Sequence, residues 1–287
     1  MHFAIKAFYI RRCLRIFPLY YAVVFAITAL GWYAARESFW WNVTYTTNIW
    51  FFRTNDWNIT VAHFWSLAVE EQFYVMWPWI VLLVPQKWLV ATISGLIVVG
   101  VLTTITFAAM FPDNKFVSTL PFAAWDALGG GALLATLGAN TSSCRKFARW
   151  AILVGLPVWF FLGLGRNSLP LSISGACMHT AMVYVCVWIV WAISISRATG
   201  VGRVFRSRPL VGMGVISYAL YILHPFCPFV WEKMVKMFGM PEVLTSVLSL
   251  RVLCCFILLI TVAAMSWFLY EKPLNRLKAR FPYIPLP

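Results

Sequence analysis

The sequence contains few charged residues and very few acidic ones. Charged side chains make up 11% of the 287 residues, with only 9 Asp and Glu, whereas soluble domains carry about 25% charged residues. Hydrophobic residues make up 62% of the chain. This composition excludes an ordinary soluble enzyme, a disordered chain and a nucleic-acid-binding module, and it leaves no room for a sizeable soluble domain. The sequence also lacks a CxxC pair, a Cys/His cluster at zinc spacing and internal repeats, so we expect neither a disulfide framework nor a bound metal.

Long apolar runs fill most of the chain. A helix that crosses a membrane requires about 20 mostly apolar residues. The sequence therefore predicts an all-α, polytopic integral membrane bundle that forms a single domain over residues 1–287. The eight expected spans are Ile16–Ala35, Phe64–Val84, Trp88–Met110, Leu120–Leu137, Phe147–Leu164, Ile173–Ile195, Leu210–Val230 and Val243–Tyr270.

The cations between these spans indicate an orientation. If the N-terminus is cytoplasmic, 16 of the 23 Lys and Arg residues lie in inner segments and 7 in outer segments. Inner loops of membrane proteins are enriched in Lys and Arg. We therefore expect both termini in the cytoplasm and membrane lipids around the chain, and the net charge of +14 reflects topology rather than nucleic-acid binding.

Three arginines precede the first span. Arg12 and Arg15 are three residues apart and so share one face of a helix at the expected inner membrane surface. A pair of guanidinium groups suits bidentate recognition of phosphate. The alternatives are a topology signal and contact with lipid headgroups.

A carboxylate lies inside the second expected span. Glu70 is about two turns into an apolar helix, where a charged group is costly in lipid and points to a function. Helical spacing places Ser66 and Tyr74 on the face of Glu70, with His63 nearly in line. We take Glu70 and His63 as candidate catalytic residues, and Trp65, Ser66 and Tyr74 as candidate substrate-binding residues. The alternative is a structural polar cluster that holds helices together.

Further polar residues lie at expected outer span ends. His224 is a candidate catalytic residue, although a single histidine is often only a hydrogen-bonded structural residue. Tyr221, three residues before it, shares its helix face, and Asp126 lies at another outer span end. We take Tyr221 and Asp126 as candidate substrate-binding residues. The glycines after Asp126 favour close helix packing, and no Lys-Ser/Thr follows them to make a phosphate loop.

Four short strings resemble the membrane acyltransferase-3 family, the integral-membrane O-acyltransferases of cell-surface glycans. They occur in the family's order and cover almost the whole chain. The strings are Arg-Arg-x-x-Arg-Ile-x-Pro-x-Tyr (Arg11–Tyr20), Trp-Ser-Leu-x-x-Glu-x-Gln-Phe-Tyr (Trp65–Tyr74), Ile-Ser-Tyr-x-Leu-Tyr-x-x-His-Pro (Ile216–Pro225) and Glu-Lys-Pro (Glu271–Pro273).

The resemblance implies transfer of an acyl group, usually acetyl from cytoplasmic acetyl-CoA, to a hydroxyl of a carbohydrate outside the bacterial cytoplasmic membrane. The acceptor would be lipopolysaccharide, peptidoglycan or an exopolysaccharide. Arg12 and Arg15 match the family's Arg-x-x-Arg pair, which would meet the CoA phosphates. Glu70 matches the acidic position of the Trp-Ser-Leu string.

The chain also differs from the family that it resembles. The family usually begins with two more spans, the first of which carries the principal catalytic histidine, whereas this chain opens at the residues that follow them. We therefore expect a chain that is incomplete at its N-terminus relative to the family. Alternatives to an active enzyme are a non-catalytic member that acts as a binding partner and a proton-coupled transporter.

Overall fold

The computed structural model describes residues 2–57, 60–165, 169–196 and 200–283. These residues are helical nearly throughout, and no strand occurs among them. The predicted all-α fold is therefore confirmed. The chain divides into two compact units, one made of Met1–Val43, Asn58–Phe64 and Arg208–Pro287, and the other of Thr44–Trp57 and Trp65–Ser207. The single domain over 1–287 stays a prediction.

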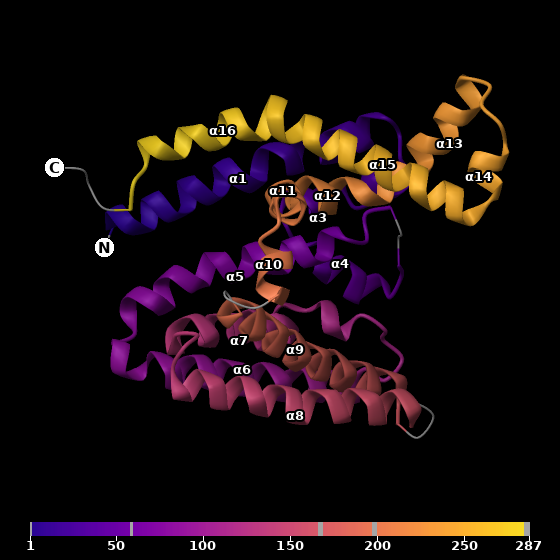
Figure 1. The fold of residues 1–287 in the computed structure, drawn as a ribbon. Coiled ribbons are helices and arrows are strands. Elements are labelled where there is room, and N and C mark those ends of the chain that lie inside the picture. Colours follow the sequence, from indigo (N-terminus) through magenta and orange to yellow (C-terminus); the bar gives the residue numbers. More distant parts are fainter. Residues whose placement is uncertain (1, 58–59, 166–168, 197–199, 284–287) are drawn as a thin grey trace. The chain divides into compact units, whose positions relative to one another are not determined.

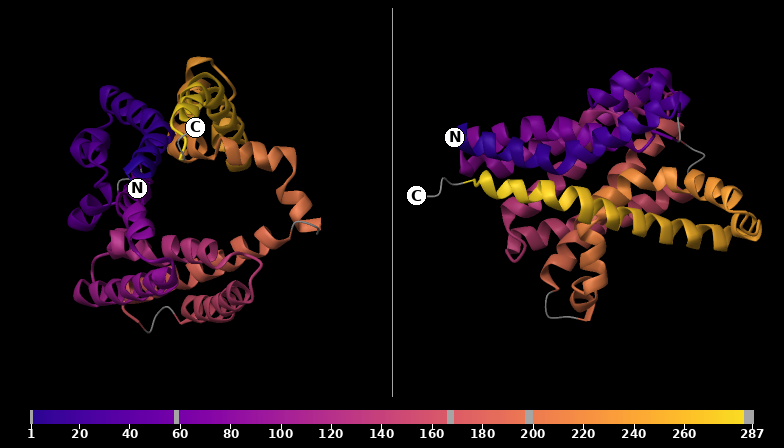
Figure 2. Two further views of the ribbon diagram at one scale, coloured as in Figure 1. Left: turned by 90° about the vertical axis from the view of Figure 1, so that its left-hand side faces the viewer. Right: turned by 90° about the horizontal axis from the view of Figure 1, so that it is seen from above.

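The first unit is built on a long N-terminal helix and the C-terminal helices that lie along it. Figures 1 and 2 show the first part of α1 side by side with α16. Two tyrosine hydroxyls hold this arrangement: Tyr218 donates to the carbonyl of Ile16 at 2.6 Å, and Tyr270 to that of Pro18 at 3.2 Å. The elements are α1 (His2–Ala29), α2 (Tyr33–Glu37), α3 (Phe39–Val43), α11 (Arg208–Val215), α12 (Ser217–Leu223), η3 (His224–Phe226), α13 (Cys227–Met237), α14 (Val243–Ser246), α15 (Leu248–Ser266), the π-helical η4 (Trp267–Glu271), α16 (Lys272–Arg276) and η5 (Leu277–Arg280).

The second unit contains a bundle of α6, α7, α8 and α9, in which α8 and α9 lie side by side (Figure 1). Leu134, Ala148 and Val187, from three of these helices, belong to one buried apolar cluster. The elements are α4 (Thr47–Thr54), α5 (Phe64–Leu83, whose first residue belongs to the first unit), α6 (Gln86–Met110), η1 (Val117–Thr119), η2 (Pro121–Ala124), α7 (Trp125–Leu137), α8 (Ser142–Leu164), α9 (Leu171–Ile195) and α10 (Gly200–Phe205).

Glycine allows the closest helix contacts in this bundle. A Cβ atom built on Gly155 of α8 would lie 2.8 Å from the carbonyl oxygen of Ala181 in α9. A Cβ on Gly129 would meet Ile97 at 2.7 Å, and one on Gly130 would meet Val187 at 2.8 Å. Gly129 and Gly130 therefore serve helix packing, as the pattern predicts, whereas an added Cβ on Gly131 would meet no atom within 4 Å.

Five helices among the described residues are long and apolar enough to cross a membrane, or six if one bent pair counts as a single span. The five are Phe3–Ala29, Gln86–Met110, Ser142–Leu164, Ser172–Ile195 and Leu248–Arg280, and the pair is Arg208–Val215 with Ser217–Met237, bent by 58°. This supports a multi-pass membrane protein, while the number of eight spans and the cytoplasmic termini stay predictions.

Two of the expected membrane spans have a different form in the structure. The segment Leu120–Leu137 begins as the 3₁₀-helix η2, and α7 has only 13 residues, or roughly 20 Å at 1.5 Å per residue. It is therefore too short to cross a hydrocarbon core of about 30 Å. Helix α5 has 20 residues, but its mean hydropathy is lower than that of the candidate membrane spans, because Glu70, Glu71 and Gln72 lie in its first half.

Candidate functional site

A group of cations lies where the start of α1 meets the C-terminal helices. Arg11 has a structural role there: its Nη1 donates to the carbonyls of Lys278 at 2.9 Å and Phe281 at 3.2 Å. Its guanidinium also lies over the ring of Tyr283, 4.9 Å from the centroid. Arg11 therefore ties the end of the chain to α1, and this role was not visible in the sequence because the partners are more than 260 residues away.

Arg12 and Arg15 lie in the same group. Lys278 interacts electrostatically with Arg11, Arg12 and Arg15, and Arg15 is exposed while Arg12 is half-buried. Repulsion between like charges at close range is costly, and a bound anion relieves it. The first unit thus brings the two predicted donor-binding arginines together with Lys278, a third cation that the sequence analysis did not single out.

One buried carboxylate adjoins these cations. Glu271 is 5% exposed, accepts a hydrogen bond from the Ser266 hydroxyl at 2.9 Å and interacts electrostatically with Arg15. It ends the π-helical turn η4, and π-helical turns occur frequently at functional sites. The closing Glu-Lys-Pro string therefore contributes a carboxylate beside the cations.

Two histidines lie together elsewhere in the first unit. The rings of His63 and His224 have centroids 5.3 Å apart. Nε2 of His63 lies 3.1 Å from the carbonyl oxygen of Ile222, and Nδ1 of His224 lies 2.7 Å from that of Tyr221. The Tyr221 hydroxyl donates to the carbonyl of His63 at 2.9 Å. Tertiary structure thus joins His63 to Tyr221 and His224, two predicted site residues that lie about 160 positions later in the sequence.

The hydrogen bonds assign a tautomer to each neutral ring. A carbonyl oxygen only accepts, so the ring nitrogen that faces it must carry the proton. His63 is therefore protonated at Nε2 and His224 at Nδ1. His224 is exposed, and its Nε2 holds the lone pair, so this side chain has the form that a general base needs.

His63 is suited to a different role. It lies in the turn before α5, outside the helices, and is 8% exposed. Burial, and next the nearby His224, lower the pKa of His63 to about 3. A group with so low a pKa is neutral near pH 7 and is a weak base. We therefore interpret His63 as a positioning residue beside His224.

α1 connects the cations and the histidine pair. Phe64 packs against Tyr20 of α1 with ring centroids 5.1 Å apart, and Phe226 packs against Trp32, which follows α1, at 5.4 Å. At 1.5 Å per residue, Tyr20 is roughly 12 Å along the helix from Arg12. The first unit therefore holds a group of cations and a pair of histidines at different levels of one helix.

The second unit contains the remaining predicted residues. On α5, the Tyr74 hydroxyl donates to Oε1 of Glu70 at 2.5 Å, as their spacing predicts, and Ser66 lies one turn earlier. Trp65 lines a hollow that also contains Lys115. His63 directly precedes α5, and its alignment with Glu70 stays a prediction.

Asp126 has a partner that the sequence did not reveal. It is 2% exposed, accepts a hydrogen bond from the Ala127 amide at 2.7 Å and has Oδ2 4.0 Å from Nδ1 of His179. This pairing is not visible in the sequence, because α7 and α9 approach each other only in the folded bundle. No group of three or more His, Cys, Asp or Glu residues in the described part of the chain is placed to hold a metal ion.

Comparison with known proteins identifies the class. Residues 2–266 match the acyltransferase-3 family model, described as an acyltransferase domain, and the chain belongs to this family. The peptidoglycan O-acetyltransferase OatA of Listeria monocytogenes is 25% identical over 77% of this chain and 39% of its own length. YrhL of Bacillus subtilis, which carries a provisional name as a peptidoglycan O-acetyltransferase, is 24% identical over 94% of this chain and 45% of its own length. The chain thus spans less than half the length of these relatives, and no solved structure matches it.

Proposed function

We propose that this chain transfers an acyl group, acetyl in the first instance, from acyl-CoA to a hydroxyl of a cell-surface carbohydrate. Family membership supports acyl transfer, and the names of the two relatives favour peptidoglycan as the acceptor. The observation that carries the proposal is the presence of a cation group and an exposed histidine at different levels of α1. The uneven distribution of Lys and Arg supports a cytoplasmic membrane location with both termini inside.

The donor is proposed to bind through its phosphates. Arg12, Arg15 and Lys278 would hold the diphosphate of CoA, because guanidinium groups bind phosphate in a bidentate way and an ammonium binds it as a point charge. Glu271 limits the net charge of the site and orients Arg15. Arg11 is already occupied by two backbone carbonyls and is expected to support the site rather than bind the donor.

The proposed chemistry is a direct acyl transfer. Nε2 of His224 takes the proton of the acceptor hydroxyl as the oxygen attacks the thioester carbonyl carbon. The C–S bond then breaks, an ester forms, and the imidazolium returns the proton to the CoA thiolate. An acyl-enzyme route remains the alternative. The family resemblance assigns the main base to a histidine of a preceding span, and His224 is the proposed base among the residues described here.

The remaining predicted residues are proposed to bind the acceptor. Glu70, held by Tyr74, can accept hydrogen bonds from sugar hydroxyls or support a base. Trp65 offers an aromatic face, and Ser66 and Asp126 offer polar groups. Tyr221 is already tied to the carbonyl of His63, so we assign it to positioning the histidine pair.

The test is transfer of labelled acetyl from acetyl-CoA to peptidoglycan in membrane vesicles from a strain that lacks its own surface O-acetyltransferase. Arg12→Ala and Arg15→Ala are each expected to raise KM for acetyl-CoA by about tenfold or more, since a hydrogen bond to a charged group contributes about 1.5–3 kcal/mol. His224→Ala is expected to lower kcat by about 10²–10⁴-fold. Arg11→Ala is the matched control, and its expected effect is a lower Tm rather than a specific rise in KM.

Each alternative gives a different result in the same assay. Full activity with Arg12→Ala, Arg15→Ala and Glu70→Ala would remove the site assignment, and full activity with His224→Ala would place the base elsewhere. Binding of CoA without turnover would identify a non-catalytic partner protein. Proton-driven uptake of solute without acyl-CoA would identify a transporter.

A further inference from the structure

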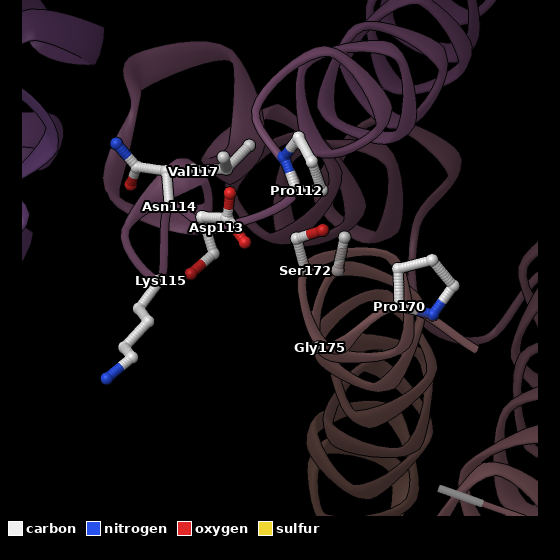
Figure 3. A pocket seen from close by; sticks show the side chains of 10 residues that line it. Pro112, Asp113, Asn114, Lys115, Val117, Pro170, Ser172 and Gly175 are labelled. Carbon is white, nitrogen blue, oxygen red and sulfur yellow. The ribbon is translucent and has the colours of Figure 1, made fainter. Parts of the chain in front are cut away.

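A cavity in the second unit has no role in the chemistry described above. It encloses about 540 Å³ between the segment that follows α6 and the first turns of α9, within the range of roughly 300–1,000 Å³ that is typical of ligand sites. Asp113, Lys115 and Ser118 line it from the segment, and Ser172 and Gly175 line it from α9. Figure 3 shows Asp113 and Ser172 on its two sides and the Lys115 side chain extending away from them.

The segment that lines the cavity is held in place by side-chain to backbone hydrogen bonds. Asn55 donates from Nδ2 to the carbonyl of Asp113 and accepts from the amide of Lys115, both at 3.1 Å. Asn114 donates to the carbonyl of Phe52 at 2.8 Å and accepts from the Phe116 amide at 2.9 Å. None of these four bonds uses the Asp113 carboxylate or the Lys115 ammonium. The backbone is therefore preorganised while these charged groups line the cavity, which lowers the ordering cost of binding.

A second, aromatic hollow adjoins the cavity. It encloses about 290 Å³, and Lys115 and Ser118 line both spaces. Trp57 and Trp65 line the second space. The Trp57 ring is stacked on Phe116 with an angle of 2° between the planes and a centroid distance of 5.4 Å, yet its side chain remains 45% exposed. A fixed, accessible indole thus lies beside hydroxyl, carboxylate and ammonium groups.

We propose that the cavity and the adjoining hollow form a binding site for an oligosaccharide of amide-bearing sugars. This inference rests on the proposed function and specifies the class of its acceptor. A pyranose ring has an apolar face that packs on indole, and its hydroxyl and amide groups match Asp113, Lys115 and Ser118. With one ammonium and one carboxylate in its lining, the cavity suits a nearly neutral ligand, whereas the phosphates of CoA suit the cation group of the first unit. The predicted orientation also places the segment after α6 on the outer side of the membrane, where surface glycan occurs, and the first turns of α9 at the outer end of a membrane span.

Gly175 provides a specific way to block this site. A Cβ atom built on Gly175 has no atom within 4 Å, so a larger side chain fits there and projects into space that the cavity occupies. Gly175→Leu is expected to fill the cavity without a clash. Gly163→Leu is the matched control, because Gly163 of α8 also has no atom within 4 Å of its added Cβ and does not line the cavity.

The experiment measures binding of the β-1,4-linked tetramer of N-acetylglucosamine to the full chain in lipid nanodiscs by saturation-transfer NMR, with maltotetraose as the control sugar. We expect Gly175→Leu and Trp57→Ala to weaken binding of the tetramer at least tenfold, and Gly163→Leu to leave it unchanged. Lys115→Ala, an exposed substitution that does not threaten folding, is expected to weaken binding about 3- to 10-fold. Equal affinity of the two glycine variants, or no binding to the unsubstituted chain, would overturn the proposal.

A parallel assay of acetyl transfer distinguishes failure of the proposed saccharide site from failure of the proposed transferase function. If the tetramer binds and Gly175→Leu abolishes binding while no acetyl is transferred, the saccharide site stands and the transferase assignment fails. If acetyl is transferred and Gly175→Leu changes neither tetramer affinity nor the acceptor KM, the transferase assignment stands and the saccharide site is wrong. Binding of acetyl-CoA is expected to be the same in all these variants.

Discussion

At the scale of single residues, hydrogen bonding and burial give two neighbouring histidines different chemistry. His63 is enclosed and donates to a carbonyl through Nε2, whereas His224 is exposed and donates through Nδ1. Each carbonyl therefore fixes one tautomer. The same reasoning separates Arg11, whose Nη1 is used by backbone carbonyls, from Arg15, which is exposed.

The low pKa of His63 predicts a pH-dependent stability. Its folded-state pKa of about 3 is lower than the unfolded value of about 6.5, so the unfolded state binds an extra proton between these values. The free energy of unfolding should therefore fall as the pH decreases from about 6.5 toward 3, by at most roughly 1.4 kcal/mol per pH unit. Thermal unfolding of the detergent-solubilised protein at pH 7 and pH 5 measures this effect.

The comparison variant is His63→Gln, which keeps a hydrogen-bond donor but does not titrate. It is expected to lose less Tm between pH 7 and pH 5 than the unsubstituted protein. Identical losses of Tm in the two proteins would show that His63 is not buried in its neutral form.

At the scale of elements, the contact between α8 and α9 depends on a missing side chain. An added Cβ on Gly155 would meet backbone atoms of α9, the carbonyl oxygen of Ala181 at 2.8 Å and the amide nitrogen of Val185 at 3.3 Å. Backbone atoms cannot move aside as a flexible side chain can. The helix axes must therefore separate if this position carries a larger residue.

Gly155→Ala is accordingly expected to destabilise the protein by about 1–3 kcal/mol, the usual cost of overpacking, and to lower Tm. Gly163→Ala in the same helix has open space around its Cβ and is expected to leave Tm unchanged or raise it, because alanine favours helix by up to about 1 kcal/mol. Both variants are compared by thermal unfolding in the same detergent. A similar change in both would refute the close contact.

At the scale of the whole molecule, the distribution of cations predicts the direction in which the chain crosses the membrane. Lys115 belongs to an expected outer segment and Lys146 to an expected inner one, and both side chains are exposed. Lys115→Cys is therefore expected to react with a membrane-impermeant maleimide in intact cells. Lys146→Cys is expected to react only after the membrane is opened.

The unsubstituted chain, with its 7 cysteines, provides the background labelling for this measurement. The reverse pattern, with Lys146→Cys labelled in intact cells and Lys115→Cys protected, would place both termini outside the cytoplasm. It would also remove the argument that the proposed saccharide site faces the surface glycan.

Much of this protein follows from its sequence. The all-α membrane fold comes from long apolar runs, since a buried backbone in lipid must satisfy its hydrogen bonds within a helix. The family follows from four short strings in order. Local spacing also predicts the Glu70–Tyr74 hydrogen bond, because residues four apart on a helix are neighbours.

Only the tertiary structure decided which distant residues meet. It paired His63 with His224, Asp126 with His179 and Arg11 with the carbonyls of Lys278 and Phe281, and it formed the cavity around Asp113 and Ser172. The physical reason is that helical periodicity determines which face a side chain occupies but not which other helix covers that face. Those contacts depend on packing between helices. Two helices approach most closely where no side chain separates them, as at Gly155.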